Sequence, residues 1–288
     1  MAEKGELRRL LAGGQQIVAP GVFEMFSARI ADRMGFAALY MTGYGISASH
    51  LGVADAGLVT YSDMVERART IASGTTTPLI ADADTGFGGL LNVDHTVRGY
   101  EAAGVQAIQL EDQEMPKRCG HQPGRRVVPL ADMLRKIEVA LAARSDADML
   151  LIARSDARSG HGIEEALKRG KAFAAAGADV VMLEGLAGEE EFARAGDAID
   201  APLMANMVPG GSSPMLDPET LARLGYRVLI YPAAGMAAAC AAMHEAYRHL
   251  RAHGTTAGSP VPAWDLPAIN DIAGFTELRA FEARFAEI

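Results

Sequence analysis

The alternation of short β-rich runs with longer helical segments constrains the fold of this chain more than any other feature. Apolar, β-branched runs recur as far as residue 231, and segments with helical periodicity separate them. The expected strands are residues 16–20, 37–42, 78–83, 107–112, 149–154, 179–184, 202–207 and 227–231. The clearest helices are expected at residues 62–72, 130–143, 163–176 and 218–224. Because the eight strands are apolar on both faces, they favour an α/β fold closed into a (β/α)8 TIM barrel over an open sheet.

One catalytic barrel domain is expected over residues 1–254, since no linker rich in Ser, Pro or Gly interrupts the chain before that point. The remaining residues, 255–288, form a tail that contains the only tryptophan, Trp264, and a helical run over residues 276–285. A (β/α)8 barrel has its eight helices without this tail. We therefore expect the helical tail to pack on its own barrel or on a partner subunit.

The charge balance is acidic, with 27 basic against 36 acidic side chains and a net charge of −9. This balance disfavours nucleic acid or an anionic membrane as a partner. No uncharged apolar run reaches the roughly 18 residues of a membrane span. The N-terminus lacks the pattern of a secretory signal, and two cysteines are too few for a disulfide framework. A cytoplasmic protein is therefore expected.

Polar residues follow six consecutive expected strands, where the active groups of a TIM barrel lie. In chain order they are Thr42, Gly43, Tyr44, Asp55, Asp82, Asp84, Glu111, Lys117, Cys119, Gly120, His121, Arg154, Glu184 and Asn206. Burying so many ionisable groups on one rim costs free energy unless they are paired or bound to a metal. The pattern indicates an active site.

Asp82, Asp84 and Glu111 come from adjacent strand ends and offer the oxygen ligands that Mg²⁺ or Mn²⁺ prefers. The alternative is that one or two of them cap helices or brace turns. Arg154 suits a forked contact with a carboxylate or a developing oxyanion. Its alternative is a salt bridge to Glu184 or Asp156.

Cys119 lies in the long loop over residues 113–129, beside Lys117, Arg118 and His121. Neighbouring cations lower the pKa of a thiol, so this cysteine is expected to exchange a proton near neutral pH. Cys240 lies in an apolar helical run and is expected to be a buried packing residue.

Three motifs together resemble the isocitrate lyase and phosphoenolpyruvate mutase superfamily. They are the segment Asp82-Ala83-Asp84-Thr85-Gly86-Phe87-Gly88-Gly89, the segment Glu111-Asp112-Gln113 and the loop Lys117-Arg118-Cys119-Gly120-His121. The loop motif is that of the carbon–carbon lyase branch, and the match spans about residues 15–250. The resemblance implies a TIM barrel, a helix exchanged between subunits, a homotetramer built as a dimer of dimers, Mg²⁺, and a mobile loop with a catalytic cysteine.

The resemblance also implies a role for each matching residue. The metal-site carboxylates are Asp55, Asp82, Asp84 and Glu111, with Asp82 as the most direct ligand. The substrate-binding residues are Thr42, Gly43, Tyr44, Asp82, Gly120, His121, Arg154, Glu184 and Asn206. The catalytic residues are Cys119, Arg154, Lys117, His121 and Tyr44. The general base stays open among Tyr44, Glu184 and a metal-bound water.

One departure narrows the expected substrate. The methylisocitrate lyase pattern has an arginine after strand eight that binds a third carboxylate, whereas residues 231–237 contain none. Residues 42–49 and 206–211 look instead like the 2-alkylmalate and 2,3-dimethylmalate lyases, whose plant petal-death members also cleave oxaloacetate. The expected reaction is Mg-dependent cleavage of a 2-hydroxydicarboxylate to an α-keto acid such as pyruvate and a carboxylate, with Cys119 as the general acid.

Four alternatives remain open. The first is an oxaloacetate hydrolase that releases oxalate and acetate. The second is a methylisocitrate lyase in which Arg125 or Arg126 replaces the missing arginine. A phosphonopyruvate or carboxyphosphonoenolpyruvate mutase is disfavoured by Cys119, and a non-catalytic dicarboxylate-binding protein by the complete set of acidic and thiol positions.

Overall fold

The computed structural model describes residues 2–285. The chain divides into two compact units, Met1–Ala234 and Gly235–Ile288. The expected boundary at residue 254 falls one residue after helix α10 (Ala234–His253), which belongs almost entirely to the second unit.

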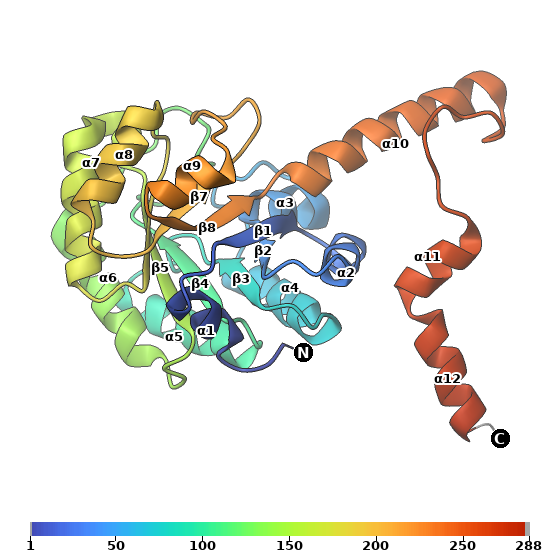
Figure 1. The fold of residues 1–288 in the computed structure, drawn as a ribbon, viewed down its shortest axis with the longest axis horizontal. Helices are drawn as coiled ribbons and strands as arrows, with labels where there is room; N and C mark the ends of the chain where they lie inside the picture. The colour runs from blue at the N-terminus through green and yellow to red at the C-terminus, as the bar shows by residue number, and fades with distance from the viewer. Residues whose placement is uncertain (1, 286–288) are drawn as a thin grey trace. The chain divides into compact units, whose positions relative to one another are not determined.

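The first unit contains a closed barrel of eight parallel strands, in which β1 pairs with both β2 and β8 (Figure 1). The strands are β1 (Ile17–Val22), β2 (Leu39–Met41), β3 (Leu79–Asp82), β4 (Ala107–Glu111), β5 (Leu150–Ser155), β6 (Val180–Leu183), β7 (Leu203–Asn206) and β8 (Tyr226–Tyr231). Each overlaps one expected strand. The predicted TIM-barrel fold is therefore confirmed.

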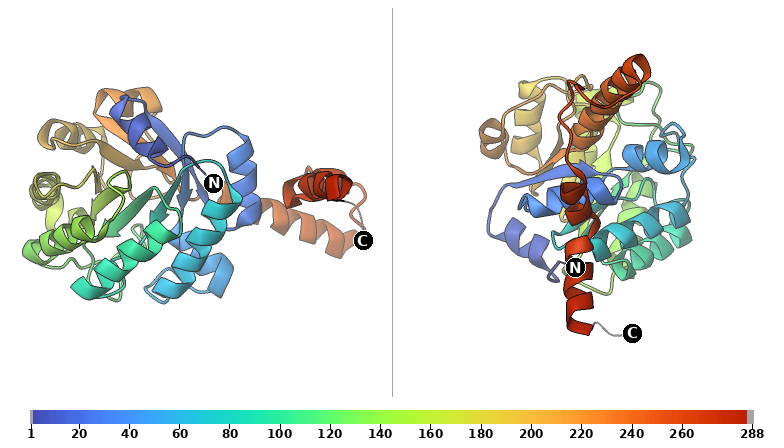
Figure 2. Two further views of the ribbon diagram at one scale, coloured as in Figure 1. Left: turned by 90° about the horizontal axis from the view of Figure 1, so that it is seen from below. Right: turned by 90° about the vertical axis from the view of Figure 1, so that its right-hand side faces the viewer.

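Helices surround the strands of this unit (Figures 1 and 2). They are α1 (Glu6–Ala12), α2 (Met25–Arg33), α3 (Gly43–Ile46), η1 (Ser47–Leu51), α4 (Tyr61–Gly74), α5 (Leu90–Ala102), α6 (Leu130–Ala143), α7 (Arg158–Ala175), α8 (Glu189–Ala198) and α9 (Pro218–Arg223). Local signals set their ends. A capping box between Thr60 and Asp63 starts α4, and Gly104 and Gly177 follow α5 and α7 with left-handed φ angles of 88° and 96°.

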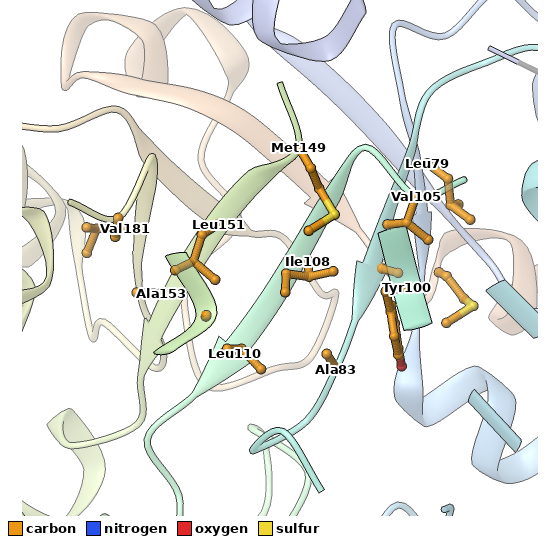
Figure 3. Packing of buried hydrophobic residues seen from close by; sticks show 14 of the residues in the cluster. Leu79, Ala83, Tyr100, Val105, Ile108, Leu110, Met149, Leu151, Ala153 and Val181 are labelled. Atoms are coloured by element: carbon orange, nitrogen blue, oxygen red, sulfur yellow. The ribbon is translucent and has the colours of Figure 1, made fainter. Parts of the chain in front are cut away.

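Two apolar layers hold the barrel together. The outer layer lies between strands and helices, where Ile108 and Leu110 of β4 pack near Leu151 and Ala153 of β5 (Figure 3). The inner layer fills the barrel with the side chains of Leu7, Ile17, Ala19, Ala38, Tyr40, Ile80, Ala107, Leu150, Ile152, Val180, Met182, Met204, Val228 and Ile230. Leu7 of α1 lies at the N-terminal end of this layer, where its N–H donates to Gln106 Oε1 (3.0 Å).

On several strands the inward-facing side chains change from apolar to charged toward the C-terminal end. In β5, Leu150 and Ile152 belong to the inner layer, and Arg154 is the next residue on that face. In β4, Ala107 is followed two and four residues later by Gln109 and Glu111. Because the strands are parallel, all their C-terminal ends meet on one rim. The fold therefore gathers the expected site residues at that end.

The second unit consists of α10, α11 (Leu266–Ala273) and α12 (Phe275–Phe285). Helix α12 matches the helical run expected from the sequence, whereas α11 was not expected; its N-cap is Asp265, which accepts from the Ala268 N–H. Residues 286–288 of the expected tail lie outside the described residues. Within the described chain no side chain of α10 or α12 is buried, and Cys240 is exposed, so its expected burial is wrong for this chain.

None of the helices within residues 2–285 is both long enough and apolar enough to cross a membrane.

Candidate active site

The turn after β3 aims two carboxylates at one place. The Asp84 N–H donates to Asp82 Oδ1 (3.0 Å), and the Gly43 N–H donates to Asp82 Oδ2 (3.3 Å). Asp84 itself has a left-handed φ of 47°, a conformation that Asp tolerates better than most residues. A Cβ at Gly43 would lie 2.7 Å from Asp82 Oδ2 and 3.5 Å from Asp84 Oδ1. Glycine is therefore required where the backbone approaches these oxygens.

Lys117 reaches this turn from the long loop. Its buried Nζ lies 2.5 Å from Asp55 Oδ1 and 2.7 Å from Asp84 Oδ1. Burial alone would lower the pKa of Lys117, but the surrounding carboxylates, Asp84 first, raise it well above its ordinary value. Burial raises the pKa of Asp84 to about 6, although Lys117 acts in the opposite direction.

Glu111 faces the same space from the end of β4. Its Oε2 lies 3.4 Å from Arg154 Nη1, and its Oε1 is buried without a hydrogen-bond partner among the described residues. Burial raises the pKa of Glu111 well above its ordinary value, against the effect of Arg154. A buried carboxylate oxygen without a partner needs an explanation, and a bound ion is one.

These oxygens fit a divalent cation that takes only part of its coordination from the protein. The Lys117 contact with Asp84 is an ion pair without hydrogen-bond geometry, so Asp84 Oδ1, like Glu111 Oε1, has no hydrogen-bond partner within residues 2–285. No three acidic, thiol or imidazole groups of the described chain converge closely enough to hold an ion alone. Mg²⁺ is commonly held by one or two carboxylates and completed by water and substrate oxygens. Asp82, Asp84 and Glu111 suit that arrangement.

Arg154 is held by a carboxylate that faces it from its own strand end. Asp156 Oδ2 accepts from Arg154 Nε and Asp156 Oδ1 from Arg154 Nη2, both at 2.9 Å. Glu184 Oε2 is 4.0 Å from Arg154 Nη2. The alternative interpretation, a salt bridge to Asp156, is therefore correct for this structure, and the Nη1 edge still faces Glu111.

His121 closes the opposite side of the rim. Its Nδ1 accepts from the Ser212 N–H (3.3 Å), and its Nε2 lies 3.5 Å from Asn206 Nδ2. Asn206 Nδ2 also donates to Glu184 Oε2 (3.0 Å). Burial is the largest effect on His121 and lowers its pKa. The neutral imidazole is favoured.

Cys119 lies half-buried in the loop, and its N–H donates to the Asp55 carbonyl (3.1 Å). Burial raises the pKa of the thiol, and Asp55 adds to that effect, so the expectation of a lowered pKa is wrong. The backbone hydrogen bond of His121, followed by Arg154 and Lys117, opposes this shift but does not outweigh it. The adjacent Gly120 is packed so tightly that a Cβ there would lie 2.5 Å from Arg154 Nη2.

Two expected site residues differ from the rest. Tyr44 is 46% exposed, whereas Glu111 and Arg154 are buried. The Thr42 hydroxyl accepts from the Gly45 N–H (3.3 Å) and caps α3. The Thr42 hydroxyl therefore has a structural role as the N-cap of α3.

Sequence reasoning missed a second line of charges behind the site. Asp112 Oδ1 accepts from the Asp156 N–H (2.8 Å), and Asp112 Oδ2 accepts from Ser155 Oγ (2.7 Å) and Arg169 Nη1 (2.9 Å). Arg125 Nη1 donates to Asp156 Oδ1 (2.6 Å). The available signal was the pair Glu111-Asp112, because neighbouring strand residues face opposite sides and an acid on the helix side needs a cation there.

Comparison with known proteins gives a family. Residues 7–251 match the model of the phosphoenolpyruvate phosphomutase family. A 2,3-dimethylmalate lyase of Eubacterium barkeri is 45% identical over 99% of each chain, and a 2-methylisocitrate lyase of Aeropyrum pernix is 38% identical over 98% of this chain and 90% of its own.

Solved structures of similar enzymes agree with this family. An oxaloacetate acetylhydrolase in complex with the inhibitor 3,3-difluorooxalacetate has a TM-score of 0.92 at 38% identity, covering 97% of this chain and 96% of its own. A phosphonopyruvate hydrolase in complex with oxalate and Mg²⁺ has a TM-score of 0.88 at 32% identity over 100% of each chain. The chain belongs to the phosphoenolpyruvate phosphomutase family, within the superfamily that also holds isocitrate lyase. It is an enzyme of the carbon–carbon lyase type, as the sequence predicted.

Proposed function

We propose that this enzyme cleaves a 2-hydroxydicarboxylate of the 2-alkylmalate or 2,3-dimethylmalate type to pyruvate, or a homologous α-keto acid, and a second carboxylate. One observation carries the proposal: an oxygen-rich turn (Asp82 and Asp84), a buried guanidinium (Arg154) and a loop thiol (Cys119) meet on one rim of the barrel. Its similarity to the 2,3-dimethylmalate lyase supports the substrate class.

Asp82, Asp84 and Glu111 would hold the cation, Mg²⁺ or Mn²⁺, with Asp55 acting through Lys117. When bound, the cation supplies Lewis-acid polarisation of the oxygens on C1 and C2 of the substrate. The Gly43 backbone closes one side of this space. Arg154 and Lys117 are the fixed cations that would neutralise the charge of the substrate's carboxylates.

The cleaved bond is C2–C3. Glu184 is the buried protein group proposed to take the C2 hydroxyl proton, since it lies between Arg154 and Asn206. The electron pair that the lost proton leaves on the C2 oxygen then forms the second bond of the keto group, and the C2–C3 bonding pair leaves on C3 as a carbanion stabilised by its own carboxylate. Arg154, with Lys117 and the neutral His121 nearby, would bear the charge that develops there.

Cys119 would protonate the carbanion. A general acid must carry its proton when the bond breaks, and burial raises the pKa of Cys119, which keeps the thiol protonated at neutral pH. Gly120, the next residue, packs against Arg154 and Glu184, which supports this role for the neighbouring thiol. A closed loop would also exclude water from the carbanion.

The dicarboxylate assignment rests on what the cations already bind. Arg126 pairs with Glu114 while its side chain is 74% exposed, and Arg125 is buried against Asp156. Neither is positioned to replace the arginine missing after β8. A third substrate carboxylate would therefore lack a partner, which disfavours methylisocitrate.

Two product assays test this function. Pyruvate release from 2-methylmalate and 2,3-dimethylmalate is expected, with little oxalate release from oxaloacetate. Oxalate release without pyruvate release would assign the oxaloacetate hydrolase reaction suggested by the similarity to oxaloacetate acetylhydrolase. Neither product, with dicarboxylate binding retained, would refute the proposed substrates.

We also propose a cytoplasmic homotetramer, a dimer of dimers in which the C-terminal helices pack on a second copy of the chain. The second unit exposes large apolar side chains, including Tyr247 (66%), Trp264 (55%) and Phe281 (61%). Such a set in a water-exposed segment is typical of an interface. Light scattering should give four chains for the full protein, and removal of residues 255–288 should give smaller species.

A further inference from the structure

The loop that carries Cys119 is attached to the barrel by its two halves in different ways. Residues 114–126, here called the cysteine loop, leave and return through the antiparallel bridge between Gln113 and Val127. The first half is fixed by the Gln113 side chain, which exchanges hydrogen bonds with the Arg118 backbone (2.8 and 2.9 Å), and by Lys117 on Asp55. In the second half, Arg125 is the buried side chain.

Arg125 and Arg154 share one carboxylate. Asp156 Oδ1 accepts from Arg125 Nη1 at 2.6 Å and from Arg154 Nη2 at 2.9 Å, while Asp156 Oδ2 accepts from Arg154 Nε at 2.9 Å. The Arg125 side chain is 3% exposed and that of Asp156 0%. Burial alone would raise the pKa of Asp156, but the two guanidiniums hold it below its ordinary value. Asp156 is therefore a charged link between the loop and the site.

Asp156 is held by residues outside the cysteine loop. Its backbone N–H is fixed on Asp112, and Asp112 is fixed in turn by Arg169, whose Nη1 also donates to the Val128 carbonyl (2.9 Å). The anchored carboxylate thus gives Arg125 a rigid partner. Removing the guanidinium leaves Arg154 as the only cation that donates to Asp156 among the described side chains, which changes the forces that orient Arg154 toward Glu111.

We infer that Arg125 latches the cysteine loop in its closed position and, through Asp156, positions Arg154 for the reaction. Arg125 is a positioning residue, because its contact with the reacting groups runs through Asp156. The positioning half of the inference rests on the proposed lyase function, whereas the latch does not.

The chain offers a matched control in the adjacent residue. Arg126 has the same side chain on the same loop, but it pairs with Glu114 at the surface (3.0 Å) and is 74% exposed. A surface pair of this kind contributes little to stability. Any effect of Arg125→Met that Arg126→Met does not share therefore belongs to the Asp156 contact.

The latch is tested by the rate at which iodoacetamide alkylates Cys119, without substrate, in a Cys240→Ser background. Opening of the loop should expose the half-buried thiol, so Arg125→Met is expected to raise the alkylation rate about tenfold or more, with Arg126→Met within about twofold of the parent. Arg125→Lys, which keeps the charge without the fork, should lie between. Equal rates for Arg125→Met and the parent would overturn the latch. If Arg125→Met does not fold, Arg125→Gln takes its place and should show the same rise in alkylation rate.

The positioning role is tested on the lyase reaction by separating kcat from KM. Misplacing Arg154 should lower kcat for 2,3-dimethylmalate by about 10- to 100-fold in Arg125→Met, with partial recovery in Arg125→Lys. If Arg125→Met is alkylated faster but keeps its kcat, the latch is supported and the positioning role is refuted. If the proposed substrate is wrong, the parent enzyme will not turn over 2,3-dimethylmalate, but Arg125→Met will still be alkylated faster than Arg126→Met. The two failures can therefore be told apart.

Discussion

The two ends of the barrel interior are built from the same strands and differ in nearly every property. At the N-terminal end the inward side chains are apolar, from Leu7 and Ile17 to Leu150 and Val180, and all four are at most 1% exposed. At the C-terminal end the same faces carry the charges of the active site. The first end gains free energy from burial, whereas the second loses it.

The cost of the charged end is visible in its carboxylates. Burial raises the pKa values of Asp84 and Glu111, so it disfavours the charged form of both carboxylates. Lys117 and Arg154 compensate this cost from the loop and from β5. The comparison teaches that the C-terminal end of the barrel serves binding and chemistry rather than stability. Substitutions at the C-terminal end should therefore lower activity, and substitutions at the N-terminal end should lower stability.

The largest effect is expected on removing the cation. Excess EDTA, or Asp82→Asn, should lower turnover by about 10³-fold or more, because the Lewis-acid contribution of a bound metal is several kcal/mol. The unfolding temperature of Asp82→Asn without metal should stay near that of the parent. Full activity in EDTA would refute the metal assignment.

Loss of the loop acid should have the next largest effect. Cys119→Ser should lower kcat by about 10²- to 10⁴-fold, since a hydroxyl is a far weaker acid than a thiol. Cys240→Ser, at an exposed position of α10, serves as the control and should keep kcat. Equal rates for the two variants would remove Cys119 from the mechanism.

The two ends can be compared directly through one residue each. Ile152→Ala in the inner layer should lower the free energy of unfolding by about 2–5 kcal/mol, with activity per folded molecule largely retained. Glu111→Gln should leave the free energy of unfolding unchanged or raise it, because glutamine has nearly the shape of glutamate but carries no charge that must be buried. The activity of this variant should fall. Chemical denaturation together with rate assays measures both. A strongly destabilised Glu111→Gln would break the distinction between the ends.

The last expected effect is a pH dependence of stability in the metal-free protein. The pKa of Asp84 in the folded state, about 6, lies above its ordinary value of 3.8, so the folded protein binds this proton more tightly than the unfolded chain does. The resulting stability is fully present below about pH 4 and is lost as the pH rises through 6. In EDTA, Asp84→Asn should therefore gain roughly 3 kcal/mol over the parent between pH 4 and pH 7. A stability difference between Asp84→Asn and the parent that stays constant from pH 4 to pH 7 would contradict this prediction.

The sequence was sufficient for most of the fold because its signals were local and repeated. Each strand had an apolar run of its own, and glycines such as Gly104 and Gly177 marked helix ends with the left-handed angles that the structure has. Helix α11 was missed because it is short and begins with Leu266-Pro267, where proline suggests a break although it is favoured in a first helical turn.

The site was predictable in position but not in electrostatics. Strand ends identified Asp82, Glu111 and Arg154, since one rim must hold them all. The pKa of Cys119 was predicted in the wrong direction because the cations are visible in the sequence, whereas burial and the contact with Asp55 exist only in the folded chain. The link from Arg125 to Asp156 likewise joins residues 31 positions apart.

The most direct test of the account is the ratio of kcat/KM for 2,3-dimethylmalate to that for 2-methylisocitrate. The charged end of the barrel has cations for two carboxylates, and residues 231–237 supply none for a third. Burying an unpaired carboxylate costs several kcal/mol, so the dicarboxylate should be preferred by about 10³-fold or more. A preference for 2-methylisocitrate would contradict the assignment and identify a methylisocitrate lyase instead.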